Sequence, residues 1–226
     1  MPRYAGYLLL RGMVDADDLP AEWRAHFLDG HLHLLRLQGH HFVVYEVPPT
    51  ALAGPRRLNW GWYLAASEAQ REGLMRRAGL SPDALIVPAN RLHLDDRREV
   101  VARAADLWPT PWAELVARTT AAGGLFVNAI HELVSLAVVS VPVVLVGDAA
   151  HLMSPITGAG AALAMRDALA LGQALSTSRG QGSAEQLDWR GLQRAMGSSR
   201  DAALLAVRRS RAWAAATLGV AEWPAN

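Results

Sequence analysis

The pattern of apolar and polar positions in the first third of the chain predicts a β meander. Residues 7–11 form a short apolar run. Residues 31–38 and 41–47 are two β-like runs separated by a glycine and a histidine, which favours a hairpin. Residues 58–64 form a third run. Such a meander presents one face to a core and the other to solvent or a ligand.

Helical spacing and helix-end signals appear between and after these runs. Two aspartates at residues 95 and 96 suit a helix N-terminus, and the last segment is expected to be interrupted near Gly197. The predicted helices cover residues 19–28, 68–77, 95–107, 111–120, 158–175 and 189–218.

Two further strands are expected in the second half of the chain. Residues 125–133 resemble a strand that leads inward, and residues 141–146 are a β-branched run typical of a buried strand. Residues 176–183, rich in serine and glycine, are interpreted as an exposed linker between two helices. The mixture of strands and helices indicates an α/β or α+β fold.

The amino-acid composition excludes several kinds of functional site. The chain has no cysteine, and all 22 basic residues are arginine, which excludes disulfides, thiolate metal sites and a lysine Schiff base. A net charge of +1 argues against a nucleic-acid partner. No apolar stretch approaches the roughly 20 residues that cross a bilayer, so no membrane partner is expected and a cytoplasmic location is predicted.

One segment in the last third has the pattern of a ligand site. A buried strand is expected to end at Val146, Gly147 permits a tight turn, and Asp148 follows where open α/β sheets bind their ligands. Gly158 and Gly160 open the next helix without side chains, so backbone N–H groups and the positive helix end face the same place. A flat or anionic ligand fits such a site.

The same segment resembles a known motif. The Gly147-Asp148 pair, followed at fixed offsets by further matching residues, is similar to the second flavin-binding motif of the FAD-dependent aromatic monooxygenases of the p-hydroxybenzoate hydroxylase type. Those further positions are His151, Pro155, Gly158, Gly160 and Asp167-Ala168. Residues 3–7, 11–12, 57–63, 111–112 and 126–130 also fit, in particular the hydroxylases that resemble 2,6-dihydroxypyridine 3-monooxygenase.

The resemblance implies both an activity and a set of roles. The activity is hydroxylation of an aromatic or heteroaromatic ring, with FAD as cofactor and NADH or NADPH as reductant. Asp148 would hydrogen-bond a ribityl hydroxyl of FAD, and Pro155 would pack beside the flavin ring. The other implied cofactor contacts are Gly147, Gly158 and the backbone N–H groups of Gly160, Ala161 and Ala162. Ala162 departs from the family, which commonly has asparagine there.

A Gly-x-Gly-x-x-Gly fingerprint for the FAD pyrophosphate does not occur in the sequence. We therefore expect a substrate-domain sheet (residues 1–120) and the C-terminal part of an FAD-binding domain (residues 121–226), without the N-terminal Rossmann half. This corresponds to roughly 55–60% of such an enzyme. A truncated or split monooxygenase is expected, with a separately encoded N-terminal half, and a homodimer, as candidate partners.

Strand alternation divides the third run into two faces. Trp60 and Trp62 share one face, for which core packing is the favoured interpretation, while Asn59 and Tyr63 share the other. Asn59 and Tyr63 are candidate contacts for a small aromatic substrate. Arg11 and His41 are further candidates for binding polar parts of that substrate.

Other interpretations remain open. His31 and His33 alternate on one strand near two more histidines, but no carboxylate joins them at a recognisable spacing, so no metal is predicted. His151 is expected to pair structurally with Asp148, and Asp167 to be a structural hydrogen-bonding group. No catalytic residue is identified. The alternative function is a non-catalytic remnant or binding module that keeps an aromatic-ligand pocket.

Overall fold

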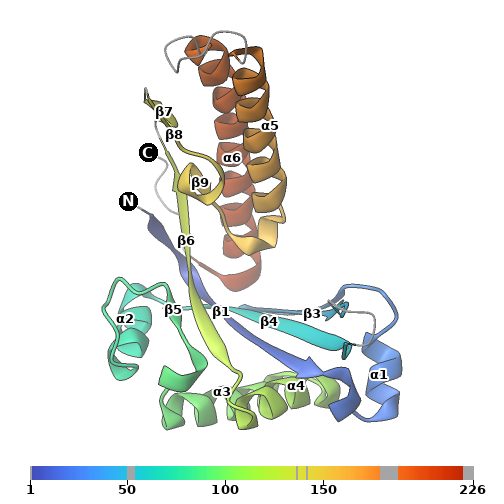
Figure 1. The fold of residues 1–226 in the computed structure, drawn as a ribbon. Coiled ribbons are helices and arrows are strands. Elements are labelled where there is room, and N and C mark those ends of the chain that lie inside the picture. Colours follow the sequence, from blue (N-terminus) through green and yellow to red (C-terminus); the bar gives the residue numbers. More distant parts are fainter. Residues whose placement is uncertain (1, 50–53, 136, 141, 179–187, 221–226) are drawn as a thin grey trace. The chain divides into compact units, whose positions relative to one another are not determined.

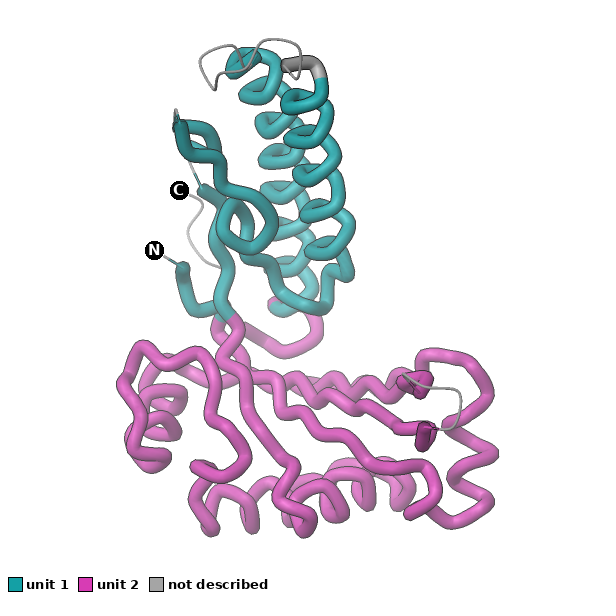
Figure 2. Tube along the Cα trace, in the orientation of Figure 1, with its two compact units in different colours: residues 1–5, 131–214, 222–226 teal, residues 6–130, 215–221 magenta. Residues whose placement is uncertain are grey.

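The structure is a computed structural model that describes residues 2–49, 54–135, 137–140, 142–178 and 188–220. The chain divides into two compact units (Figure 2). Unit 1 comprises residues 1–5, 131–214 and 222–226, and unit 2 comprises residues 6–130 and 215–221. None of the helices in the described ranges has both the length and the apolar character that a bilayer crossing demands.

A mixed α/β fold is observed, as the sequence predicts, and most of unit 2 is one sheet with four helices (Figure 1). The strands follow the order β2-β3-β4-β1-β6-β5, and β9 pairs with the end of β6. The strands are β1 (Arg3–Asp15), β2 (His33–Leu37), β3 (His40–Val47), β4 (Arg57–Ala65), β5 (Ile86–Val87) and β6 (Phe126–Val134). The helices are α1 (Ala21–Phe27), α2 (Glu68–Arg77), α3 (Leu94–Leu107) and α4 (Thr110–Ala121).

The predicted meander is confirmed in its pairing. β2 and β3 form an antiparallel hairpin, and β4 lies antiparallel to both β3 and β1. α2 begins at Glu68, as predicted, and Ser67 and Gln70 form a reciprocal capping box at its N-terminus. The two short helical turns of this unit are η1 (Ala16–Asp18) and η2 (Ala89–Arg91).

Aromatic side chains form the core between the sheet and the helices α3 and α4, which run along one face of it (Figure 1). Trp60 and Trp62 are buried on that face, as predicted. Trp60 Nε1 donates a hydrogen bond of 2.8 Å to Thr119 Oγ1 in α4. The Phe42 ring lies 5.3 Å from both Trp108 and Trp112, edge to face. This packing leaves the opposite face of the sheet to carry other side chains.

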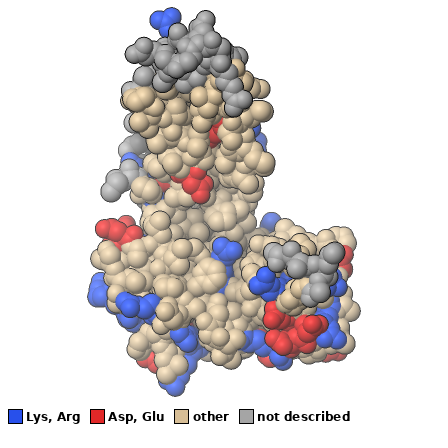
Figure 3. Space-filling model, viewed as in Figure 1, with Lys and Arg blue, Asp and Glu red and all other residues tan. Residues whose placement is uncertain are grey.

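Unit 1 is built around two long helices, α5 (Gly160–Ser178) and α6 (Trp189–Leu218). They pack through a core that contains Leu192 and Met196 of α6, with Leu171 of α5 against them. Figure 3 shows few charged side chains on the face of this unit that it presents. The remaining elements are β7 (Val139–Ser140), β8 (Val143–Val144), η3 (Gly147–Ala149), β9 (His151–Leu152) and η4 (Pro155–Thr157).

The predicted buried strand over residues 141–146 is wrong for the described part of that run. Only Val143 and Val144 form a strand, which pairs with β7, and Val143 is 57% exposed. A β-branched run becomes a buried strand only when neighbours cover both its faces and both its edges, and the described residues supply one short partner. Val141 lies outside the described residues.

The predicted break near Gly197 is also wrong, because α6 is continuous from Trp189 to Leu218. A glycine inside a helix costs about 1 kcal/mol relative to alanine. Buried side chains on either side of it, Met196 and Ala203 among them, hold the helix through this position. Part of the predicted linker is helical as well, since α5 extends to Ser178; residues 179–183 lie outside the described residues.

One boundary between the two compact units lies between residues 130 and 131, within β6, and residues 1–5 belong to unit 1. The assignment of residues 1–120 to a substrate domain and residues 121–226 to an FAD-binding domain concerns function and stays a prediction.

Candidate functional site

The turn at Gly147 is hydrogen-bonded to a buried carboxylate. Asp167, on α5, is fully buried, and its Oδ2 accepts a 2.9 Å hydrogen bond from the Gly147 N–H. Gly147 has φ +56°, a conformation that side-chain-bearing residues rarely adopt. A Cβ at this position would lie 3.3 Å from the Cβ of Ala164. Glycine at this position and the carboxylate of Asp167 together bring the turn close to the helix.

The same carboxylate binds His151, which corrects the expected pairing of His151 with Asp148. His151 Nε2 lies 2.7 Å from Asp167 Oδ2, and both side chains are almost completely buried. The sequence separation hid this pair, because His151 lies in β9 and Asp167 two turns into α5. The expectation that Asp167 is a structural hydrogen-bonding group is consistent with these two contacts.

A second hydrogen-bonded turn, over residues 154–158, directly precedes α5. The hydroxyl of Thr157 donates to the Ser154 carbonyl at 2.8 Å and accepts from the Ala159 N–H at 3.2 Å. Gly158 follows in a left-handed conformation, with φ +62°. Thr157 was missed in the sequence, although a Ser-x-x-Thr pattern beside a proline is typical of such a hydrogen-bonded turn.

The N-terminus of α5 carries hydrogen-bond donors that are open to a ligand. The first backbone bond into the helix runs from the Leu163 N–H to the Ala159 carbonyl. Within the described ranges, the N–H groups of residues 160–162 have no acceptor. No heavy atom lies within 4 Å of a Cβ built on Gly158 or Gly160. The space beside the helix end is therefore not filled by side chains.

These residues fit the ring end of a flavin. The pyrimidine edge of the ring has carbonyl oxygens that accept hydrogen bonds and gains negative charge on reduction, which matches free N–H groups at a positive helix end. The Asp148 carboxylate is exposed and points to no partner among the described residues, so it can accept from a hydroxyl. Pro155, Ala161 and Ala162 are exposed as well.

All four candidate substrate residues lie on one face of the sheet, opposite the tryptophans. In the strand register, His41 faces Tyr63, and Arg11 faces Gly61, while Asn59 follows on β4. His41, Asn59 and Tyr63 are each no more than 6% exposed. Arg11 is partly exposed and lies 5.4 Å from the Phe126 ring. Of the four, Arg11 is therefore the residue that a ligand reaches most readily.

Burial changes the titration of two members of this face. Desolvation, with a smaller contribution from Arg36, lowers the pKa of His41 to about 4. The Arg36 Nε lies 3.2 Å from His41 Nδ1 and donates to it. Burial also raises the pKa of the Tyr63 phenol. At neutral pH both groups are uncharged, so this face offers neutral donors and acceptors beside the charges of Arg11 and Arg36.

His33, the first residue of β2, and His31, which precedes that strand, have a carboxylate partner, which corrects the expectation that none joins them. Asp29 Oδ1 lies 2.9 Å from His33 Nε2, and Asp29 Oδ2 lies 3.3 Å from His31 Nδ1. Hydrogen bonding from the His31 backbone N–H, with the two imidazoles, lowers the pKa of Asp29 to about 2. No group of three potential ligands suited to a metal ion is found among the described residues.

Two family models match the chain. A model described as FAD binding domain-like matches residues 4–132, and a model described as FAD binding domain matches residues 137–196. The second range contains the turn at Gly147 and the start of α5. The resemblance seen in the sequence motif is thus confirmed.

Several known proteins that resemble this chain are named as hydroxylases or monooxygenases. The 2,6-dihydroxypyridine 3-monooxygenase of Paenarthrobacter nicotinovorans is 28% identical over 85% of this chain and 48% of its own length. The structure of 2,6-dihydroxypyridine-3-hydroxylase from Arthrobacter nicotinovorans matches the whole chain and 55% of its own, with a TM-score of 0.82 and 23% identity. A salicylate hydroxylase substrate complex matches 97% of the chain and 49% of its own, with a TM-score of 0.63 and 20% identity. The chain spans about half the length of these proteins.

Replacing Asp167 by alanine should destabilise unit 1. The change leaves the Gly147 N–H and the His151 Nε2–H buried without an acceptor, and each such group costs about 1–3 kcal/mol. We expect the free energy of unfolding to fall by roughly 2–5 kcal/mol, measured by denaturant titration of the whole chain. Asp201→Ala, an exposed position on α6, is the control and should change it by less than about 0.5 kcal/mol. Equal effects of the two changes would show that Asp167 does not anchor the turn.

The stability of the chain should fall as the pH drops from about 6.5 toward about 4. The unfolded chain has a histidine pKa near 6.5, whereas the folded His41 has a pKa of about 4, so protonation in this window favours the unfolded state. The contribution of His41 is complete above pH 6.5 and amounts to up to about 3 kcal/mol. Denaturant midpoints measured across this range should depend less on pH in His41→Gln. His31→Gln, whose side chain is exposed, should keep the original profile, and an unaltered slope in His41→Gln would contradict the assignment.

Proposed function

The chain belongs to the FAD binding domain-like family, and we propose that it forms the substrate-binding part and the flavin-ring part of an FAD-dependent aromatic hydroxylase. The observation that carries this proposal is the open N-terminus of α5 beside the exposed Asp148. Both lie within the match to the FAD binding domain model.

The role of each element at the flavin turn follows from its chemistry. The N–H groups of Ala161 and Ala162 bind the pyrimidine edge of the ring and, with the helix dipole, stabilise negative charge on it by about 0.3–1 kcal/mol or more where water is excluded. Asp148 accepts from a ribityl hydroxyl, and Gly147 lets that carboxylate emerge from a turn fixed by Asp167. FAD, when bound, supplies the oxygen-activating chemistry, with NADH or NADPH as reductant.

The substrate is proposed to be a small aromatic or heteroaromatic ring that carries hydroxyl or oxo groups. Arg11 supplies a positive charge for an oxygen of such a ring. Neutral Tyr63 and neutral His41 add a hydrogen-bond donor and hold the position of neighbouring groups without adding to the positive charges of Arg11 and Arg36. The name of the 2,6-dihydroxypyridine relative supports a ring of this class.

The binding site for the ADP half of FAD is proposed to come from a second polypeptide segment. The Gly-x-Gly-x-x-Gly fingerprint that holds the pyrophosphate does not occur in the 226 residues. A separately encoded N-terminal half is the partner that would provide it, and a homodimer of the assembled enzyme remains part of the proposal.

Reconstitution tests the flavin assignment. The chain should be co-expressed with the part of the Paenarthrobacter nicotinovorans relative that its alignment leaves uncovered. We expect a complex that retains FAD through gel filtration and shows flavin absorbance, whereas the chain alone should bind FAD more weakly than micromolar in isothermal titration. Asp148→Ala should lower FAD retention by about tenfold, as expected for loss of one hydrogen bond to a charged group.

The control for this experiment is Asp201→Ala, which changes an exposed carboxylate on α6. It should leave FAD retention unchanged. Sub-micromolar FAD binding by the isolated chain would overturn the divided site. A colourless complex that still binds hydroxypyridines would favour the alternative of a ligand-binding module without redox activity.

Replacing Tyr63 by phenylalanine should weaken substrate binding in the reconstituted enzyme. The change removes one neutral donor from the face that also carries Arg11, at a cost of about 0.5–1.5 kcal/mol, or roughly a 2–10-fold rise in the dissociation constant. The constant is measured by the change in flavin absorbance on titration with 2,6-dihydroxypyridine. Asp201→Ala, which changes an exposed residue of α6, serves as the control and should leave the constant unchanged. Equal constants for Tyr63→Phe and the unchanged protein would remove Tyr63 from the substrate site.

A further inference from the structure

Helix α5 is apolar on the side that faces solvent as well as on the side that packs against unit 1. From residue 160 to residue 175, its ionisable residues are Arg166 and the buried Asp167. A helix that is apolar all round is normally buried, whereas a helix at the surface of a soluble protein has a polar outer side. α6 follows this usual pattern. Its exposed charged residues are Arg190, Arg194, Asp201, Arg208 and Arg209.

The solvent-facing residues of α5 form one face of the helix. Residues three, four, seven and eight positions apart lie on the same side of an α-helix, and the exposed residues of α5 recur at that spacing. Met165 is 66% exposed and Leu169 is 62% exposed, the two highest values among the exposed large apolar side chains of the described ranges. We call this surface the α5 outer face. It consists of Ala161, Met165, Ala168, Leu169, Gly172 and Leu175.

Two exposed valines lie on the segment next to α5. Val143 is 57% exposed and Val146 is 37% exposed. Leu145, between them, packs against the same buried cluster as Leu171 of α5. Unit 1 therefore exposes several large apolar side chains on neighbouring elements. On a soluble protein, a contiguous apolar surface of more than a few hundred Å² usually marks a binding site for another polypeptide.

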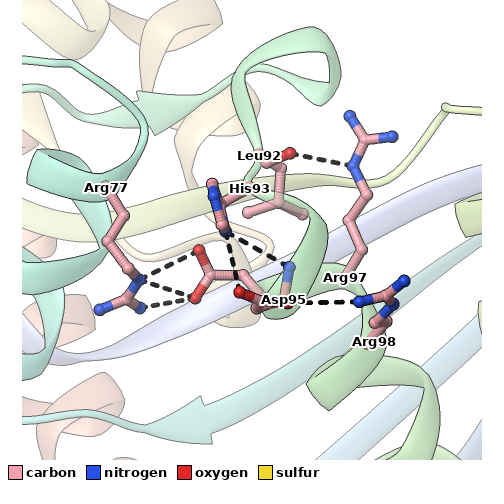
Figure 4. Close-up of polar contacts among 7 residues, drawn as sticks. Arg77, Leu92, His93, Asp95, Arg97 and Arg98 are labelled. Atoms are coloured by element: carbon pink, nitrogen blue, oxygen red, sulfur yellow. Dashed lines mark hydrogen bonds and ion pairs between the residues drawn. The ribbon is translucent and has the colours of Figure 1, made fainter.

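An exposed apolar side chain in unit 2 has a different setting. Leu94, the first residue of α3, is 55% exposed. Its neighbours in the chain are polar: His93 contacts Asp95, and Asp95 Oδ1 lies 3.5 Å from Arg98 Nη1 (Figure 4). One apolar side chain among charged groups is ordinary on a protein surface. Leu94 is therefore a matched control for the α5 outer face.

The position of the α5 outer face beside the flavin turn indicates what covers it. The face begins at Ala161, whose N–H has no acceptor among the described residues. In the proposed function, this N–H binds the flavin ring. A chain of seven single bonds, roughly 10 Å when extended, joins the ring to the first phosphorus of FAD. The polypeptide that holds the pyrophosphate therefore has to border the N-terminus of α5.

A second copy of this chain does not meet that requirement. The Gly-x-Gly-x-x-Gly fingerprint does not occur in the 226 residues, so a copy placed on the α5 outer face would bring no such pyrophosphate site. The 2,6-dihydroxypyridine 3-monooxygenase relative matches this chain over only 48% of its own length. It therefore contains a further segment of similar size, which is large enough to cover a helix.

We propose that the α5 outer face is the docking surface for the N-terminal half of the hydroxylase. That half covers Met165 and Leu169 with apolar side chains and places its pyrophosphate site beside the start of the helix. This inference rests on the proposed function and adds the surface through which the two parts assemble. Burial of apolar area drives such an association, so docking and FAD retention can be measured separately.

Co-purification measures the docking. The tagged full chain is co-expressed with the segment of the Paenarthrobacter nicotinovorans relative that its alignment leaves uncovered. Met165→Glu and Leu169→Glu each place a charge in the proposed interface, so each should lower the amount of co-purified segment about tenfold or more. Met165→Leu keeps the face apolar and should assemble like the unchanged chain, as should the control Leu94→Glu. Flavin absorbance of the same samples reports FAD retention.

Oxidation by peroxide locates the covered surface without any substitution. Exposed methionines are converted to the sulfoxide, and mass spectrometry of their peptides gives the rates. In the complex, Met165 should react about fivefold or more slowly than in the chain alone, because the second segment covers it. Met13, which is 42% exposed on β1, is the internal reference and should react equally in both samples.

Several results would overturn the docking surface. Met165→Glu and Leu169→Glu might assemble as well as Leu94→Glu, or Met165 might be oxidised equally fast in the complex and in the chain alone. Capture of none of the segment by the unchanged chain, or a homodimer that Met165→Glu disrupts, would refute the proposed occupant. A complex that forms through Met165 but lacks flavin absorbance would instead contradict the flavin assignment and leave the docking surface in place. Because these side chains are exposed, each variant should unfold at the denaturant midpoint of the unchanged chain.

Discussion

The buried carboxylate of Asp167 is the constraint on which the flavin site depends. It accepts hydrogen bonds from the Gly147 N–H and from His151, so it ties the turn and strand β9 to helix α5. A charge this deeply buried is retained only when such partners compensate its lost hydration. Because α5 is fixed relative to the turn, its free N–H groups and the Asp148 carboxylate keep the mutual placement that a flavin ring and its ribityl chain require.

Because side chains alternate along each strand, the two faces of the sheet in unit 2 carry different kinds of side chain. One face carries Trp60 and Trp62 into an aromatic core that packs against α3 and α4. The other face carries His41 and Tyr63, both uncharged at neutral pH because burial opposes ionisation. The adjacent histidines, 40 and 41, therefore serve opposite faces.

Local signals in the sequence were sufficient for most elements and for the flavin motif. The hairpin around Gly39 depends on neighbouring residues and was predicted, whereas the capping box at Ser67 was not identified, although the helix over residues 68–77 was. Contacts between distant residues were not recoverable, which is why His151 was paired with Asp148 instead of Asp167. The run at residues 141–146 was misjudged for a related reason, since burial of a β-branched strand depends on partners that its own sequence does not specify.

The most direct test of the account is a titration of the chain with FMN, which has the ring and ribityl chain but lacks the ADP half. Amide ¹H–¹⁵N resonances would be followed as FMN is added. The account predicts that the N–H signals of Ala161 and Ala162 shift together with that of Gly147 and reach saturation at one common concentration. Shifts confined to other parts of the chain, with these three signals unmoved at saturating FMN, would contradict it.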